Sequence, residues 1–76
     1  MSKFRDYFMG MTADQRKAYA SRAGTTAYYI KTHLVSVPPR KVPREGLMRG
    51  LAQASNGDLS MGDVLAHFYG HSDEAA

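Results

Sequence analysis

The sequence has no cysteine and, among its 76 residues, only five valines and isoleucines. Without cysteine, the chain can form no disulfide bond or cysteine-based zinc site, and it has no thiol for catalysis. The shortage of β-branched residues disfavours a β-sandwich, whereas the ten alanines suit closely packed short helices. A chain of this length buries only about 60% of the surface that its unfolded form exposes, so we expect a single domain stabilised by packing alone.

Long hydrophobic runs are also missing. No uncharged run approaches the roughly 20 residues that a transmembrane helix requires. Lys3, Arg5 and Asp6 stand where a signal peptide would need an apolar segment. We therefore expect an intracellular, cytoplasmic protein with no membrane partner.

Acidic residues are scarce in the first two thirds of the chain. All ten lysines and arginines lie in positions 1–49, which carry a net charge of +7, whereas positions 50–76 carry −4, and the whole chain carries +3. A basic body of this kind is typical of a surface that binds a polyanion, because lysines and arginines that neutralise phosphates release condensed counterions. The alternative is a solvated basic face without a partner.

Two helices are predicted in the first 24 residues. Gly10 should end the first helix, whose apolar residues follow helical spacing: Phe4, Tyr7, Phe8 and Met11. Thr12 and Gln15 form a capping-box pattern, so a second helix should begin there. Gly24 can adopt a left-handed terminus at little steric cost, which places the end of this helix at about Ala23.

A third helix should follow after a turn of about three residues. Thr25 or Thr26 can cap it, and its inward residues should be Ala27, Ile30 and Leu34. Residues 36–39 include two prolines, which disfavour helical backbone before them and so stop the helix. Residues 40–43 continue as a stiff basic loop.

Two more helices are predicted in the rest of the chain. One should span about residues 44–54 and be closed by Asn56 and Gly57, with inward residues Leu47, Met48 and Leu51. Ser60 and Asp63 form a second capping box for a helix that should end at Gly70, with inward residues Met61, Val64, Leu65 and Phe68. The prediction is an all-α bundle of about five short helices over residues 1–70, followed by a flexible tail at 71–76.

The second and third predicted helices have the pattern of a helix-turn-helix. Ala20 is small where the next helix must cross, Gly24 permits the sharp turn, and Ile30 fixes the second of the two helices on the core. The segment Ala20-x-x-Ala23-Gly24-Thr25-Thr26-x-x-Tyr29-Ile30 resembles the Cro- and cI-type helix-turn-helix regulators of phages and, more closely, the YdaS-like (Cro-like) families of prophages. The resemblance covers roughly residues 12–64, including the basic, proline-containing loop and the helix after it. It implies a lambda-repressor-like DNA-binding fold in a bacterial cytoplasm or nucleoid.

The resemblance also implies roles for individual residues. Residues 25–34 would form the recognition helix in the major groove, and its base-contacting residues would be Thr26, Tyr28, Lys31 and Thr32. The residues near phosphates, which fix register without reading sequence, would be Thr25, Tyr29, Arg16, Lys17, Arg40, Lys41 and Arg44. Alternatively, Tyr29 is a core residue with a solvated hydroxyl, and Arg16 and Lys17 are solvated.

We therefore expect a homodimeric transcriptional regulator, a Cro-like repressor that occupies a palindromic operator in double-stranded DNA. The fifth helix near Phe68 and Tyr69 is the candidate dimer interface, unless Phe68 closes the monomer core and Tyr69 is surface. The alternative from another class is a protein-interaction module, an antitoxin or inhibitor that binds a partner protein.

Enzymatic and metal chemistry are not expected. Asp63, His67 and His71 are spaced by four, but Gly70 should interrupt the helix before His71. Nothing resembles a nucleophile elbow, a phosphate-binding glycine loop or a paired-carboxylate site. A domain this small also has little room for a substrate pocket. We expect no catalytic residue, metal, cofactor or small-molecule substrate.

Overall fold

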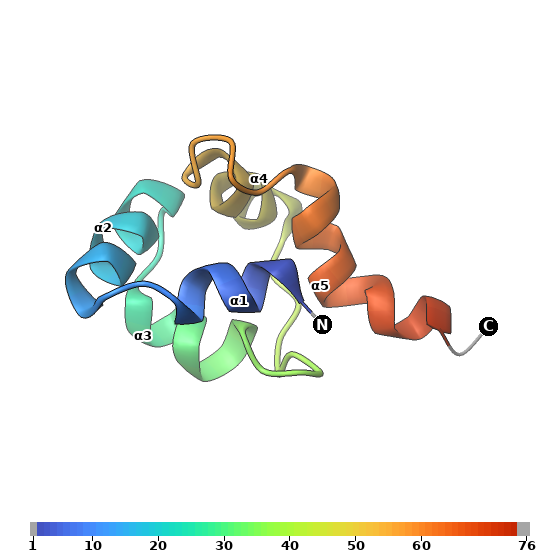
Figure 1. Ribbon diagram of the computed structural model, residues 1–76. Helices are drawn as coiled ribbons and strands as arrows, with labels where there is room; N and C mark the ends of the chain where they lie inside the picture. Colours follow the sequence, from blue (N-terminus) through green and yellow to red (C-terminus); the bar gives the residue numbers. More distant parts are fainter. Residues whose placement is uncertain (1, 75–76) are drawn as a thin grey trace.

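Helix-starting and helix-ending residues divide the chain into a series of short helices (Figure 1). The computed structural model describes the backbone of residues 2–74 and the side chains of residues 2–70. Within that range there is no strand, and the helices are α1 (Lys3–Met9), α2 (Ala13–Ala23), α3 (Ala27–Tyr29), α4 (Glu45–Gln53) and α5 (Met61–Glu74). Helix α3 continues without a break into a π-helix, η1 (Ile30–Leu34). The all-α prediction is confirmed.

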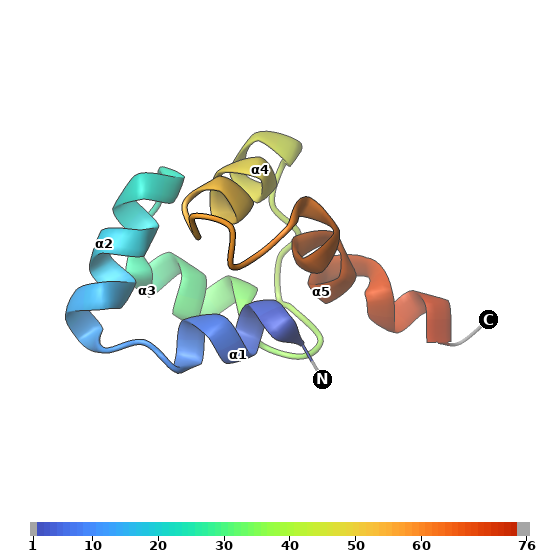
Figure 2. The same cartoon turned by 45° about the horizontal axis from the view of Figure 1, so that its top comes forward.

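The helices enclose one apolar core. Helix α1 packs on α5, α2 packs on both α3 and α4, and α4 packs on α5 (Figure 2). The largest fully buried apolar side chains come from every helical segment except α3: Phe4, Phe8, Tyr19, Ile30, Leu34, Leu51, Val64 and Phe68. The C-terminal part of α5 projects beyond the other helices in both views. The described chain is accordingly elongated, with extents of 38 × 20 × 20 Å.

The predicted caps of α2 and α3 are present. The Gln15 N–H donates to Thr12 Oγ1 and the Thr12 N–H donates to Gln15 Oε1, at 3.2 and 2.9 Å. Gly24 has φ +90°, and the N–H groups of Gly24 and Thr25 donate to carbonyls of the last turn of α2, which is a Schellman motif. Of the two threonines considered, Thr26 caps α3, because its hydroxyl accepts from the Tyr29 N–H.

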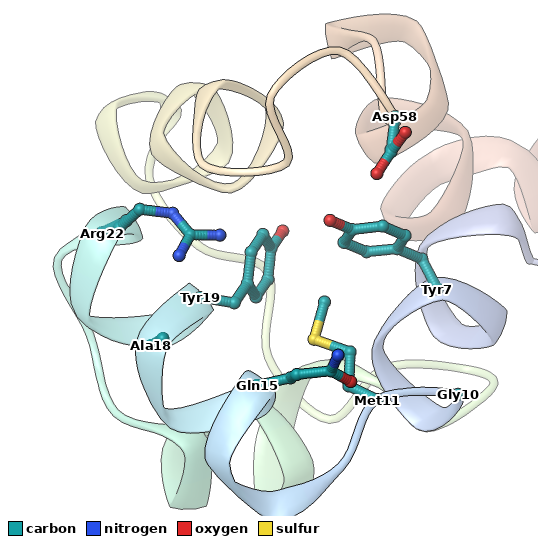
Figure 3. Close-up of a pocket in the computed structure, with 8 residues that line it drawn as sticks. All are labelled: Tyr7, Gly10, Met11, Gln15, Ala18, Tyr19, Arg22 and Asp58. Atoms are coloured by element: carbon teal, nitrogen blue, oxygen red, sulfur yellow. The ribbon is translucent and has the colours of Figure 1, made fainter.

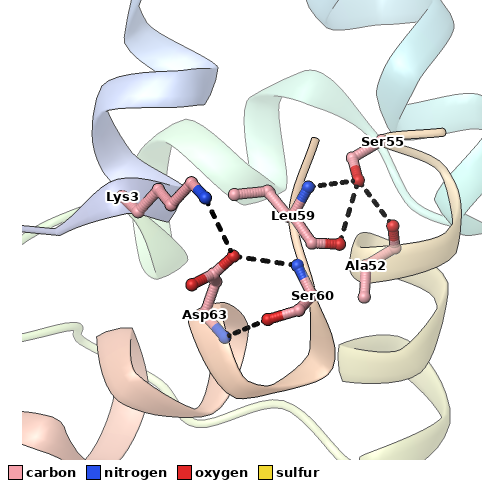
Figure 4. A network of polar contacts seen from close by, with 6 residues as sticks. All are labelled: Lys3, Ala52, Ser55, Leu59, Ser60 and Asp63. Carbon is pink, nitrogen blue, oxygen red and sulfur yellow. Dashed lines mark hydrogen bonds and ion pairs between the residues drawn. The ribbon is translucent and has the colours of Figure 1, made fainter. Parts of the chain in front are cut away.

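The predicted capping box of α5 is also present, and it is tied to α1. The Ser60 N–H donates to the Asp63 carboxylate, the Asp63 N–H donates to the Ser60 hydroxyl, and Lys3 Nζ lies 3.3 Å from Asp63 Oδ2 (Figure 4). Beside it, the buried Ser55 hydroxyl donates to the Ala52 carbonyl and accepts from the Leu59 N–H. Local hydrogen bonds therefore fix the connection between α4 and α5.

The C-terminal half of the third helix differs from the prediction, because it is a π-helix. The Val35 N–H donates to the Ile30 carbonyl, five residues back, at 3.1 Å. A π turn holds more residues than an α turn, so the residue five after Ile30 comes back to the same side of the helix. Leu34 and Val35 are therefore both buried, although the sequence pattern predicted only Leu34 as inward.

Two predictions about the fifth helix are wrong. Helix α5 continues through Gly70 to Glu74, so residues 71–74 are helical, and residues 75–76 of the predicted tail lie outside the described residues. Gly70 has no left-handed φ, unlike Gly24 and Gly57, and a glycine with helical backbone does not end a helix. Leu65, predicted to face inward, is 38% exposed, because α5 packs through the adjoining face of the helix, which carries Val64 and Phe68.

Gly50 permits the close approach of α4 to α2. A Cβ atom built at Gly50 would lie 2.6 Å from the Ala23 carbonyl oxygen, which is main chain and cannot rotate away. In the same helix, a Cβ at Gly46 would meet no atom within 4 Å. Glycine is thus required at one of the two positions and replaceable at the other.

We predict that Gly50→Ala lowers the free energy of unfolding by about 1–3 kcal/mol, because α4 must move away from α2. Gly46→Ala is the matched control, and it should leave stability unchanged or raise it by up to about 1 kcal/mol, since alanine restricts the unfolded chain. Urea unfolding monitored by circular dichroism measures both. Equal effects of the two substitutions would show that the approach is not tight.

We also predict that the stabilising effect of Asp63 depends on pH. The Ser60 N–H, and to a smaller extent Lys3, hold the pKa of the Asp63 carboxyl below its ordinary value. This contribution is therefore complete above the unfolded-state pKa of about 3.9 and is lost as the pH falls through the lower folded-state pKa. Asp63→Asn should lower the urea midpoint near neutral pH, and the gap to the wild-type midpoint should narrow toward about pH 3. A gap independent of pH would contradict this role.

Candidate functional site

Three other segments meet at the C-terminal end of η1. A helix ends in carbonyls that have no partner within the helix, and here three consecutive ones are each bonded by a different segment. The His33 carbonyl accepts from the N–H groups of Arg40 and Lys41, at 3.0 and 3.1 Å. The Leu34 carbonyl is bonded by His67 Nε2 of α5, and the Val35 carbonyl accepts from Arg5 Nη1 of α1, at 3.0 Å. The end of η1 is therefore held in place from three sides.

His67 is the buried member of this set. A carbonyl oxygen can only accept, so His67 Nε2 donates to Leu34, and its Nδ1 faces the hydroxyl of Ser2, the N-cap residue of α1. The imidazole ring also packs against Phe4 and Phe68, with ring centroids 5.0 and 4.8 Å away. Its two ring nitrogens thus link η1 to the start of α1. Among the residues that the structure describes, no group of three side chains could hold a metal ion.

The segment between η1 and α4 forms a closed turn. The two N–H groups that donate to His33 close the turn over residues 33–41, and the Ser36 hydroxyl donates to the Pro38 carbonyl inside it. Pro43 is buried and anchors the far end of the segment. Arg40 and Lys41 are exposed and lie directly beside the end of η1, because their own N–H groups make the closing bonds.

The outward side of α3 and η1 carries the side chains predicted to contact bases. Tyr28 is 76% exposed, Lys31 is exposed and Thr32 is half-buried. The Thr26 hydroxyl already accepts from the backbone as the helix cap. Tyr29 is half-buried against the core and its ring lies 5.0 Å from the His33 ring, so it follows the alternative in which its ring belongs to the core.

The ten lysines and arginines fall into two equal groups. Five have a partner within the fold: Lys3, Arg5, Arg16, Arg22 and Arg49. Within the described range of side chains, residues 2–70, the side chains of the other five make no hydrogen bond or ion pair: Lys17, Lys31, Arg40, Lys41 and Arg44. All five belong to the set that the sequence predicted to contact DNA. Four of them lie between positions 31 and 44, on η1 and the closed turn or just after it.

Arg16 and Arg22 each bond the carbonyls at the end of a neighbouring helix. Arg16 donates to the carbonyls of Phe8 and Met9 at 3.2 and 3.0 Å, and its guanidinium lies 5.3 Å from the centre of the Phe8 ring. Arg22 donates twice to the Ala54 carbonyl after α4, at 3.2 and 2.9 Å. This structural role of Arg16 competes with the phosphate contact predicted for it. The charge pattern of the sequence did not indicate the structural role of either Arg16 or Arg22.

A pocket of about 460 Å³ lies between α1, α2 and the segment before α5 (Figure 3). Two of its polar groups already serve the fold, because the Tyr19 hydroxyl donates to the Leu51 carbonyl and Arg22 bonds Ala54. Burial raises the pKa of Tyr19 and, together with the neighbouring Asp58 carboxylate, that of Tyr7. The eight described residues that line the pocket include no serine, cysteine, histidine or lysine.

The exposed side of α5 and Phe68 bear on the candidate dimer interface. Phe68 is 1% exposed and contacts Phe4 in the core, so the alternative in which it closes the monomer is the observed one. Tyr69 is 48% exposed and, with Leu65, leaves apolar surface on α5.

Over the described part of the chain, no helix has the length and apolar character needed to cross a membrane.

Comparison of the chain with models of protein families, with curated proteins and with solved structures finds no match to any of them. The arrangement of the described residues is therefore the basis for the functional argument.

We predict that Arg16 and Lys17, adjacent in α2, affect different properties. Arg16→Gln should lower the free energy of unfolding by about 1–2 kcal/mol, because two carbonyls of α1 lose their donor. Lys17→Gln, the matched control, should change it by less than about 0.5 kcal/mol, since Lys17 has no partner in the fold. Thermal and urea unfolding of both variants measure the difference, and equal stabilities would contradict the structural role of Arg16.

Proposed function

We propose that this chain is a transcriptional regulator that binds double-stranded DNA sequence-specifically, in the manner of a Cro-like phage or prophage repressor. The observation that carries the proposal is the grouping of Lys31, Arg40, Lys41 and Arg44, which have no partner in the fold, on one helix and the segment tied to its end. Unpaired cations on a fixed frame suit a partner with regularly spaced negative charges, such as the DNA backbone.

In this proposal α2, the turn at Gly24 and α3 act as a helix-turn-helix. The α3–η1 helix enters the major groove, and Tyr28, Lys31, Thr32 and the capping Thr26 face base edges. Each well-aligned base contact contributes about 1–3 kcal/mol of discrimination. The π turn changes the direction of the side chains after Ile30, so Lys31 and Thr32 approach the groove at an angle that an α-helix would not give.

The closed turn supplies the contacts that fix register on the duplex. Arg40, Lys41 and Arg44 bind phosphates, with Lys17, Thr25 and Tyr29 as further contacts. Because the backbone N–H groups of Arg40 and Lys41 bond the end of η1, these two residues keep a constant distance from Lys31. Binding therefore orders side chains rather than a loop, which reduces its entropic cost.

A single copy makes few base contacts, so we propose a homodimer on a palindromic operator, with half-sites about one helical turn apart. The exposed side of α5, with Leu65 and Tyr69, is the proposed contact between the two copies. Occupancy of the operator would exclude RNA polymerase.

The test is a selection from a random duplex pool, followed by affinity measurements at several salt concentrations. We expect an enriched palindrome, and we expect Lys31→Ala combined with Thr32→Ala to lose the preference for it while weak, salt-sensitive binding persists. Lys17→Ala, the control, should keep the preference and lower the slope of log affinity against log salt by about 0.9. If the double variant keeps its preference, the recognition helix is misassigned. If no duplex binds, or if the affinity does not depend on salt, the result favours the alternative function, a protein-interaction module such as an antitoxin.

A further inference from the structure

The tip of the closed turn presents apolar side chains to solvent. Val37 is 64% exposed and Pro38 beside it is exposed, and Val42 on the far side of the two cations is 50% exposed. Between them stand Arg40 and Lys41, and residues 36–44 contain no acidic residue. In Figure 1 this turn is drawn in light green at the lower edge of the molecule, away from α2 and α4. An apolar tip beside two cations is thus displayed outward.

Val37 and Pro38 are held where they are by bonds on both sides. Before them, Val35 is buried and its carbonyl accepts from Arg5. After them, the N–H groups of Arg40 and Lys41 bond the His33 carbonyl, and the Ser36 hydroxyl bonds the Pro38 carbonyl across the tip. Prolines 38 and 39 restrict the backbone further. The tip is therefore a stiff projection that can enter a narrow space without first being ordered.

We propose that this tip, Val37 and Pro38, is a wedge that enters the minor groove of duplex DNA and bends it. The inference rests on the proposed function, because the tip extends from the end of the helix placed in the major groove. A segment leaving that helix crosses the phosphates that border the groove and reaches the adjacent minor groove. Arg40 and Lys41 would bind those phosphates as the chain crosses them.

DNA fits the chemistry of the tip better than a protein surface does. Proteins that bend DNA from the minor groove insert apolar wedges, proline among them, that unstack a base step, and they also bring arginine and lysine side chains to the DNA. The minor groove is only about 6 Å wide, and Val37 and Pro38 are small enough to enter it. The wedge also predicts a preference for flexible pyrimidine–purine steps, because they unstack at the lowest cost.

The experiment measures bending directly. Duplexes of about 20–30 base pairs carry a donor and an acceptor dye at their ends, one with central TA steps and one with a stiff A-tract. Salt is kept near 50 mM, so that the charged surface binds either duplex whether or not an operator is known. We expect the wild-type protein to raise energy transfer on the TA duplex by an amount that corresponds to a bend of at least about 20°, and less on the A-tract.

The variant is Val37→Ser, which removes the most exposed apolar side chain of the tip and, because that side chain is exposed, leaves folding intact. It should abolish the increase in energy transfer while the affinity for the duplex falls by less than about tenfold, because the phosphate contacts remain. Met9→Ser is the matched control, an exposed apolar residue on α1 away from the turn, and it should bend DNA like the wild type.

The outcomes separate this inference from the proposed function. Binding without a bend, or a bend that survives Val37→Ser, overturns the wedge and leaves the regulator in place. A bend that depends on Val37, without any enriched operator in the selection, supports the wedge and overturns sequence-specific regulation. Failure to bind either duplex overturns both.

Discussion

The arrangement of the whole chain depends on how the carbonyls at the end of η1 are satisfied. An unbonded carbonyl in a buried position costs about as much as a lost hydrogen bond, so each one must find a donor. Here the donors come from α1, from α5 and from the segment that follows η1 itself. One helix end thereby fixes the relative positions of three parts of the chain that are distant in sequence, including the segment that carries most of the unpartnered cations.

The basic residues serve two purposes, and the division between them follows the architecture. The side chains of Arg5, Arg16 and Arg22 donate to carbonyls at the C-terminal ends of helices, because a guanidinium group offers several donors in a fixed plane. The cations left over are concentrated on one helix and the turn after it. Net charge alone does not distinguish among the ten residues, whereas the structure shows that the side chains of five have no partner within the described fold and that four of these five lie within residues 31–44.

Local features of the sequence predicted most of the fold. The capping boxes at Thr12 and Ser60 and the left-handed Gly24 were identified because each depends only on residues within one turn of it. Gly70 misled the prediction, since a glycine ends a helix only where the backbone adopts a left-handed conformation. The π turn, the second bond to His33 and the role of Arg16 were not predictable, because they depend on atoms brought together by the completed fold. For the same reason, the sequence could suggest candidate DNA-contacting residues, but it could not show which lysine and arginine side chains bond to other groups within the fold.

The acceptors at the end of η1 are main-chain carbonyl oxygens, so the bonds to them do not restrict which side chains the neighbouring surface can carry. The bonds from Arg40 and Lys41 to residue 33 join backbone to backbone, so they need no particular side chain at positions 31, 32, 40 and 41, and only proline at 40 or 41 would remove a donor. The exposed residues of η1 and of the tip of the turn can therefore be substituted without breaking the backbone hydrogen bonds that hold the turn against η1. In such a scaffold, the residues that maintain the fold differ from the residues that determine which partner binds. A few substitutions close together in the sequence can then change binding specificity.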